Sequence, residues 1–262
     1  MAAKEDPEQV KKALCELRRG IEAKAIIKDV SKLTDNFLLR FLRARNFDIE
    51  SSVTTFVKCA KTKTKVPELF LYPSELKMVF DDNILSVLKD KTPKGESICV
   101  IRLANWSDEN YDYDCILAAA FVTLEVLLMD EEVQRNGCIQ ILDLKDVDFD
   151  QLVSIEGYQV KRLTKIFNKF LPVRICDIYI VNDEKKAQLM AKKLKERVSE
   201  EEFNKFHFYG TDLTGFHEEI PAKILPTELG GEAGDFNCDE WYKTLLENED
   251  KIRKNWSLFD SE

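Results

Sequence analysis

The first part of the chain carries apolar residues at helical spacing. One amphipathic helix is predicted by four residues at steps of three and four: Val10, Leu14, Leu17 and Ile21. Thr34 is placed to cap a second helix, in which four apolar residues share a face and three arginines carry charge: Phe37, Leu38, Phe41 and Leu42, with Arg40, Arg43 and Arg45. A third helix is expected between Asp48 and Pro67, and a fourth, capped by Ser74, from Leu76 to Leu88.

The pattern changes after the turn at residues 92–95. Three short β-like runs and a weaker fourth follow, at residues 97–103, 138–144, 175–181 and 206–210. Helical patterns separate them, at residues 112–129, 152–168 and 184–198. Short strands that alternate with helices predict a mostly parallel sheet with crossover helices. A small helix near residues 238–250 is expected to pack back on the body.

Residues 116–129 read ILAAAFVTLEVLLM, an apolar segment in which only Thr123 and Glu125 are polar. The segment is too short to cross a bilayer, which takes about 20 apolar residues. A helix that is apolar on all sides is either buried in a core or lines an apolar cavity. Periodicity alone leaves both interpretations open.

Composition and charge narrow the class of protein. The chain has 262 residues, 44% of them hydrophobic, and is long enough to bury a core. Its net charge of −9 argues against nucleic acid as a partner, because an acidic surface repels phosphate. Seven cysteines without a C-x-x-C pair, two histidines and a start without an apolar run predict reduced thiols in the cytoplasm and no metal site.

Catalytic motifs are not found in the sequence. It has no G-x-S-x-G, no P-loop and no G-x-G-x-x-G after a strand. His207 lies in a β-like run and is expected to be structural, and His217 has no candidate nucleophile close in sequence. We therefore predict a protein that is not an enzyme and needs no cofactor.

Residues 185–198, KKAQLMAKKLKERV, concentrate six positive charges against one negative charge. On a helix they give a narrow apolar stripe with a basic back; the stripe is Ala187, Met190, Ala191, Leu194 and Val198. Such a helix is typical of proteins that meet an anionic membrane surface. The alternative is the solvated face of an ordinary crossover helix, and the acidic residues 200–202 directly afterwards would weaken the attraction.

Five stretches, in matching order and spacing over roughly residues 10–245, resemble the CRAL-TRIO lipid-transfer family. They are FLLRFLRARNFD (37–48), QRNGCIQILDLKDVDF (134–149), FLPVRICDIYIVND (170–183), FHFYGTDL (206–213) and IPAKILPTELGG (220–231). Within that family the chain is most similar to the branch of α-tocopherol transfer and cellular retinaldehyde-binding proteins.

The resemblance implies an α/β fold in three parts. An N-terminal helical (CRAL-TRIO N) subdomain is expected at residues 1–73, a CRAL-TRIO lipid-binding domain at 74–235 and a C-terminal helical tail at 236–262. In the second part a mostly parallel mixed sheet would form the floor of a lipid cavity. The apolar helix would be a cavity wall, and the helix at about 184–198 a mobile gate.

The family cavity and the apolar periodicity together give the expected ligand-binding residues. They are Leu117, Ala120, Thr123, Leu124, Cys138, Gln140, Leu142, Phe149, Ile155, Leu163, Phe167, Leu171, Val173, Ile175, Ile178, Met190 and Leu194. Gln140, within an apolar strand, would either address a polar group of the cargo or serve as an ordinary sheet amide.

The family also uses a basic cluster for phosphoinositides. The basic residues that fall at its positions are Arg45, Arg174 and Lys205, whereas Cys176 and Glu201 stand where further basic residues are expected. Lys192 and Lys193 occupy the gate, where tocopherol transfer proteins carry bulky apolar groups. The resemblance thus implies contact with anionic lipid, with electrostatic docking favoured over insertion.

We expect a monomeric, cytoplasmic carrier that is peripheral and transient at membranes. It would enclose one hydrophobic ligand, such as tocopherol, a retinoid or a similar lipid, and transfer it at membranes with the help of anionic lipid or phosphoinositide. Carotenoid, sterol and phospholipid also remain open as cargo. The alternative is a cargo-free membrane or protein adaptor that uses the same fold.

Overall fold

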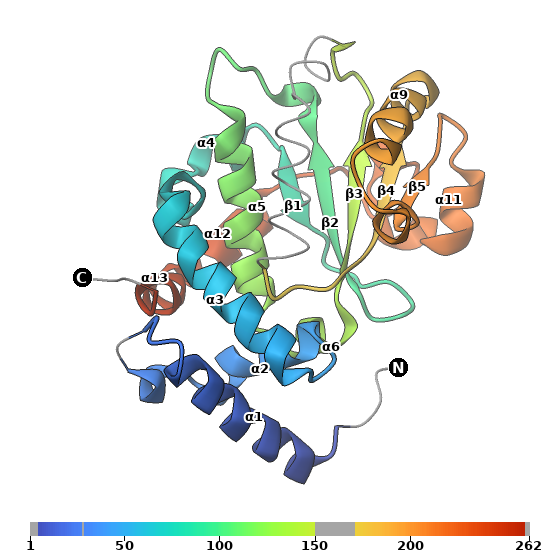
Figure 1. Cartoon of the computed structure of the whole chain (residues 1–262). Helices are drawn as coiled ribbons and strands as arrows, with labels where there is room; N and C mark the ends of the chain where they lie inside the picture. The colour runs from blue at the N-terminus through green and yellow to red at the C-terminus, as the bar shows by residue number, and fades with distance from the viewer. Residues whose placement is uncertain (1–4, 28, 150–170, 260–262) are drawn as a thin grey trace.

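The computed structural model describes residues 5–27, 29–149 and 171–259 (Figure 1). Three helices form the N-terminal part, at the bottom and lower left of the figure: α1 (Pro7–Glu22), α2 (Asp35–Ala44) and α3 (Ile49–Lys65). Each begins at a side-chain cap, as Thr34 Oγ1 accepts the N–H of Phe37 at 3.2 Å and Asp48 Oδ1 accepts that of Ser51 at 2.7 Å. The three predicted N-terminal helices are confirmed.

The predicted fourth helix, from Leu76 to Leu88, is wrong. The chain forms a short helix, α4 (Lys77–Asp81), and then an edge strand, β1 (Leu85–Val87). Asn83 ends the helix in a left-handed conformation, with φ 52°. Ser74 does not cap α4, because it lies in a 3-10 turn, Pro73–Glu75, where its N–H and hydroxyl donate to Glu249.

The sheet has five strands in the order β1-β2-β3-β4-β5. The later strands are β2 (Ser97–Arg102), β3 (Cys138–Asp143), β4 (Ile175–Val181) and β5 (Phe206–Phe208). β1 runs antiparallel to β2, and the other neighbours are parallel. The mostly parallel mixed sheet is therefore confirmed, and β1 is the strand that the sequence pattern did not reveal.

The remaining helices cover both faces and one edge of the sheet. They are α5 (Tyr113–Leu127), α6 (Glu131–Asn136), α9 (Glu184–Lys195), α10 (Glu200–Phe203), α11 (Thr214–Glu219), α12 (Asp239–Glu247) and α13 (Glu249–Ser257). Further 3-10 turns lie at Val30–Lys32, Pro67–Leu69, Leu103–Asn105, Ala222–Ile224 and Thr227–Leu229. The single C-terminal helix predicted near 238–250 is in fact two helices, which meet at Asn248. The helix predicted at 152–168 lies outside the described residues.

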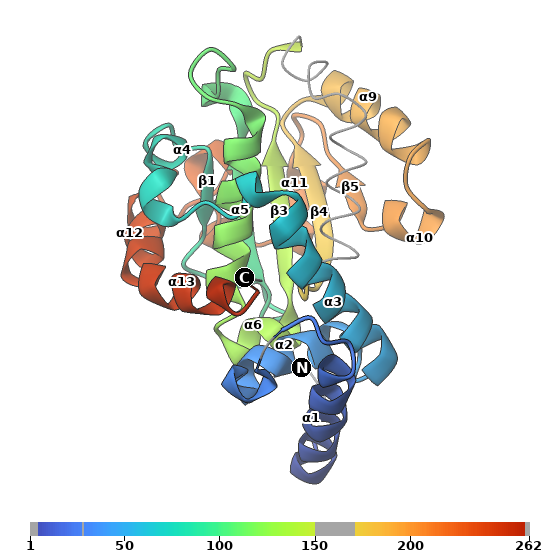
Figure 2. The same cartoon turned by 60° about the vertical axis from the view of Figure 1, so that its left-hand side comes forward.

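Two helices, α5 and α9, lie on the same face of the sheet, α5 towards β1 and β2 and α9 towards β4 and β5 (Figures 1 and 2). α11 packs on the opposite face. Its Phe216 ring lies 5.5 Å from the Tyr179 ring, and its Glu219 accepts the Tyr179 hydroxyl at 2.8 Å. The sheet is thus a middle layer, with α5 and α9 sharing one side.

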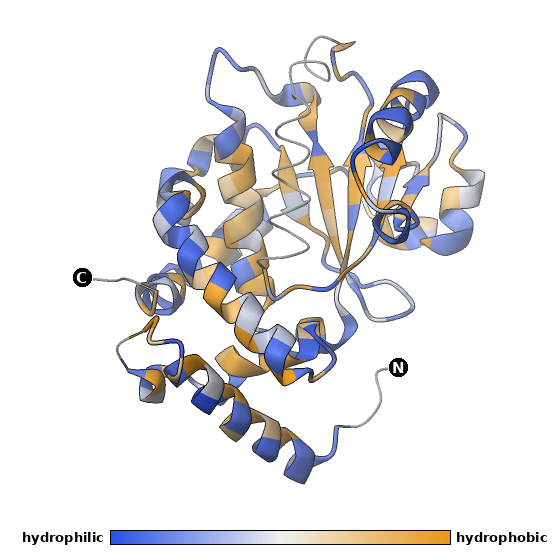
Figure 3. Cartoon of the chain, in the orientation of Figure 1, coloured by the Kyte–Doolittle hydropathy of each residue, from blue (hydrophilic) through white to orange (hydrophobic). Residues whose placement is uncertain are grey.

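Two hydrophobic cores are joined by the C-terminal helix. One surrounds the sheet and α5, which is hydrophobic along most of its length (Figure 3), and the other lies among α1, α2 and α3. Trp256 of α13 packs in the first core, and Phe259, just beyond α13, packs in the second. The end of the chain therefore fastens the N-terminal helices to the sheet layer.

A buried ion pair also crosses this junction. Arg40 of α2 donates to both carboxylate oxygens of Glu125 of α5 at 2.9 Å, and the two side chains are 3% and 11% exposed. Asn255 of α13 donates to the same carboxylate at 2.7 Å, and the Arg40 guanidinium lies 4.5 Å from the Phe37 ring centre. Burial makes this pair costly to break, because either partner alone would be an uncompensated charge.

Replacing Arg40 with Ala is expected to lower the free energy of unfolding by about 3–5 kcal/mol, since Glu125 would stay buried without its partner. The matched control is Arg18→Ala, which breaks an ion pair to the exposed Asp35 and should cost about 1 kcal/mol or less. Urea denaturation of both variants measures the difference. Equal losses in the two would contradict the importance given to the buried pair.

Candidate functional site

The strand pairing aligns side chains in rows that cross the sheet on the face covered by α5 and α9. Because paired residues in a sheet point to the same side, two rows follow from the pairing: Val87, Cys99, Gln140, Ile178 and Phe206, then Leu85, Ile101, Leu142, Ile180 and Phe208. At the middle of this face Gln140, Leu142 and Ile178 are only half-buried. Within these two rows every side chain is apolar except that of Gln140.

α5 is fixed firmly at one side of this face. Its predicted cavity residues Leu117, Ala120 and Leu124 are all buried, at 3%, 8% and 3% exposure. Thr123 points elsewhere, since its hydroxyl accepts the indole N–H of Trp241 of α12 at 3.1 Å. Thr123 therefore holds α5 to the C-terminal helices, a contact that the sequence pattern did not indicate.

Among the described residues, α9 has far fewer buried contacts at the other side than α5 has. Below it lies a separate apolar cluster with four buried side chains, of which α9 supplies two: Leu144, Ile180, Ala187 and Leu194. Half-buried Met190 packs against the same cluster. Burying one aliphatic side chain is worth about 1.5–3 kcal/mol. The contacts of α9 within this cluster are thus worth a few kcal/mol, a small part of the burial that holds α5 among the described residues.

The ends of α9 are anchored by polar contacts. Asp183 caps the helix by accepting the N–H of Lys186 at 2.9 Å, and its carboxylate pairs with Lys186 Nζ at 2.7 Å. Just before it, Asn182 donates to Asp143 at 2.7 Å and adopts a left-handed conformation, with φ 72°. At the other end, Ser199 begins α10. α9 is therefore a thinly packed helix between two fixed points.

Of the remaining predicted ligand-binding residues, some are buried, one is exposed and others lie outside the described part of the chain. Cys138, Leu171, Val173 and Ile175 are buried, at the start of β3 and in the approach to β4. Phe149, beyond the end of β3, is 55% exposed, so its ring faces solvent rather than an enclosed space. Three predicted residues lie outside the described part of the chain: Ile155, Leu163 and Phe167.

A small pocket lies at the junction of α2, α5 and α13, lined by Arg40, Phe121, Leu124, Glu125, Leu171 and Trp256 among others. It has room for about one water molecule, far too little for a lipid. Leu124 and Leu171 thus face this junction. Within the described chain, Arg40 Nε is buried without a hydrogen-bond partner.

The predicted lipid-headgroup residues fall into two groups. Lys192 is exposed and Lys193 half-buried on α9, with Lys185, Lys195 and Arg197 also exposed nearby. Arg45, Arg174 and Lys205 lie instead near the N-terminal helices and the starts of β4 and β5. Exposed Arg174 donates to Asn46 Oδ1 at 3.2 Å, which brings it next to Arg45.

Cys176 and Glu201, which stand where the family pattern has basic residues, have different surroundings. Cys176 donates its thiol to the carbonyl of Asn136 at 3.3 Å, and burial raises its pKa to about 12, so it adds no charge to the surface. Glu201 is exposed on α10. Neither position therefore adds a positive charge to those of Arg174 and Lys205.

Both histidines have structural partners. His207 Nε2 lies 2.8 Å from Asp177 Oδ1 with its ring stacked on Tyr179, and His217 Nε2 lies 2.9 Å from the carbonyl oxygen of Leu229. Within the described residues no group of His, Cys, Asp and Glu side chains has the arrangement of a metal site. None of the helices described there is long and apolar enough to cross a bilayer.

The apolar sheet face between α5 and α9 is a surface that a hydrophobic ligand can occupy, and comparisons with known proteins give the class of protein. Residues 81–231 match the CRAL/TRIO domain, and residues 7–58 match the CRAL/TRIO N-terminal domain. The chain belongs to the CRAL/TRIO family of lipid-binding proteins.

Relatives of known sequence and structure support the assignment. The chain is 33% identical over 228 residues to "Alpha-tocopherol transfer protein-like" of Homo sapiens, which covers 86% of this chain and 67% of that protein. It is 27% identical over 223 residues to Clavesin-2 of Rattus norvegicus, with 82% and 67% covered. It thus spans about two thirds of the length of these relatives. The crystal structure of Sfh5 has the same fold, with a TM-score of 0.62 at 17% identity, covering 96% of this chain and all of that one.

Proposed function

We propose that this protein is a cytoplasmic carrier that encloses a single hydrophobic ligand and exchanges it at membranes. The observation that carries the proposal is the apolar sheet face, half-buried at its middle, between the firmly packed α5 and the thinly packed α9. The 33% identity to an alpha-tocopherol transfer protein-like protein supports tocopherol as cargo, and a retinoid or a similar lipid belongs to the same proposal. The division into residues 1–73, 74–235 and 236–262 belongs to the same proposal.

In this proposal α9 is the gate. A ligand on the sheet face would bury apolar surface worth roughly 25 cal/mol for each Å², part of which offsets the cost of ordering ligand and gate. Closure over cargo is then favoured. A membrane would shift α9 towards the open state only by binding that state more tightly, and the exposed lysines of α9 supply such a contact for anionic lipid. Gln140 would meet a polar group of the cargo.

Replacing Leu142 with Trp is expected to lower the affinity for cargo by at least about tenfold, because the larger side chain occupies the space above β3. Leu246→Trp is the control, since Leu246 of α12 is 42% exposed and lies on another element. Binding of a fluorescent retinoid or tocopherol analogue is measured for each, with circular dichroism to show that the fold persists. Normal loading of folded Leu142→Trp protein would exclude this face as the ligand site.

Reversing the charge of Lys192 and Lys193 to Glu is expected to weaken association with phosphatidylserine vesicles at low salt. Each lysine near an anionic surface is worth about 1 kcal/mol, so the loss of two corresponds to about 30-fold, with repulsion in addition. The control reverses two exposed lysines on other helices, Lys12 and Lys243. If both double variants sediment with vesicles like the parent, the basic face of α9 is merely solvated.

A further inference from the structure

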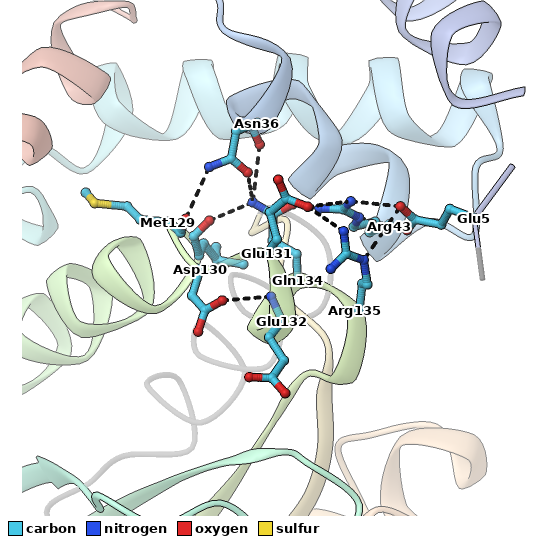
Figure 4. Close-up of polar contacts among 10 residues, drawn as sticks. Glu5, Asn36, Arg43, Met129, Asp130, Glu131, Glu132, Gln134 and Arg135 are labelled. Carbon is cyan, nitrogen blue, oxygen red and sulfur yellow. Dashed lines mark hydrogen bonds and ion pairs between the residues drawn. The ribbon is translucent and has the colours of Figure 1, made fainter. Parts of the chain in front are cut away.

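The carboxylate of Glu5 interacts with the guanidinium groups of Arg43 and Arg135 (Figure 4). Arg43 Nε donates to Glu5 Oε1 and Arg43 Nη2 to Oε2, both at 2.8 Å, and Arg135 Nε lies 3.7 Å from Oε2. A two-pronged approach of this kind suits any planar or tetrahedral oxyanion, a carboxylate and a phosphate alike. Arg43 and Arg135 are therefore called the arginine clamp here.

The charges of the clamp balance only while Glu5 is present. Glu131 of α6 pairs with both arginines, so two cations face two carboxylates. The Arg43 side chain is 4% exposed, and Gln134 accepts its Nη1 at 2.7 Å. Without Glu5, one net positive charge would remain, and the Arg43 guanidinium would lose the acceptors of two of its N–H groups. Such a site favours another oxyanion.

The clamp borders solvent and a second basic group. Arg135 and Glu131 are 37% and 48% exposed at their side chains. Exposed Arg174 donates to the backbone carbonyl oxygen of Arg135 at 3.3 Å, so this third arginine contacts the main chain of a clamp residue.

Glu5 is the part of this arrangement that is easiest to displace. It precedes Asp6, the cap of α1, and is thus outside the helix, where local opening breaks no hydrogen bond of the helix. The hydrogen bond from Arg43 is the main reason that the pKa of Glu5 lies below its ordinary value, so the carboxylate remains charged at neutral pH and fills the clamp as an anion.

We propose that the arginine clamp is an oxyanion site which Glu5 fills in cis, and that a phosphate monoester, free or on a lipid headgroup, competes with Glu5 for it. The lipid-borne form rests on the proposed membrane exchange, because docking there would give the phosphate its route to the clamp. Glu5 then sets the threshold at which phosphate-bearing lipid engages the protein.

The test compares the full chain with Glu5→Gln, which removes the charge and keeps the size, and with Glu8→Gln, which removes one from the exposed first turn of α1. Calorimetric titration with inositol 1,4-bisphosphate probes the free phosphate. Sedimentation with phosphatidylcholine vesicles, with and without phosphatidylinositol 4-phosphate, probes the lipid. Glu5→Gln should gain about tenfold in affinity, equivalent to about 1.4 kcal/mol, and Glu8→Gln should match the parent.

Adding Arg135→Gln to Glu5→Gln should remove the gain. A Glu5→Gln protein that binds both probes like the parent, or a gain that survives the second change, would overturn the proposal. In the unmodified protein, saturating inositol bisphosphate should speed hydrogen exchange at residues 5–10, because Glu5 leaves the clamp; unchanged exchange with bound probe would also overturn it.

Failure of this proposal is distinguishable from failure of the carrier function. Cargo loading depends on the sheet face and not on Glu5, so it should be equal in the parent and in Glu5→Gln. A gain for the free probe without vesicle binding would support the clamp and count against the lipid-borne source. Empty protein that still shows the gain would contradict the carrier and leave the clamp standing.

Discussion

The apolar face of the sheet has to be kept from water, and the way it is covered shapes the rest of the molecule. α5 can cover one side because it is apolar around its whole circumference, which in turn requires apolar or paired surroundings on its outer side. The N-terminal helices and the C-terminal helices provide them. At the other side, α9 has polar and basic residues on most of its surface and a narrow apolar stripe, so it can only rest on the sheet. The proposal that α9 is a gate rests on this asymmetry between the two helices.

The junction of α2, α5 and α13 contains a buried ion pair among apolar side chains. Arg40 and Glu125 pair in a setting of phenylalanine rings, and Trp256 and Phe259 carry the C-terminal helix across to the N-terminal core. An ion pair in such a place fixes which surfaces meet, since any other register leaves two buried charges unpaired. The wall of the proposed cavity is thereby held in one position, whereas in the proposed function α9 moves in response to cargo and membrane.

Much of the fold could be predicted from the sequence, and the features that could not be predicted have physical reasons. Helices with side-chain caps and strands with continuous apolar runs were predictable, because their signals are local. β1 was missed since three residues after a helix-ending Asn83 carry no clear alternation. The burial of Arg40 and Arg43 was not evident, because it depends on partners some 85 to 91 positions away. Glu125, the one acidic residue of the apolar segment 116–129, was nevertheless a signal that it needs a cation. Thr123 was assigned to the cavity, but its orientation depends on Trp241, which no periodicity reveals.

The central claim is that a hydrophobic molecule occupies the sheet face, and mass spectrometry of an organic extract from protein purified without detergent tests it most directly. The account predicts one hydrophobic molecule in about equimolar amount, released by solvent and absent from a mock purification. An empty extract, together with no binding of tocopherol, retinoid or phospholipid when these are offered, would contradict it. The cargo-free adaptor, with the lysines of α9 as its working surface, would then be the better description.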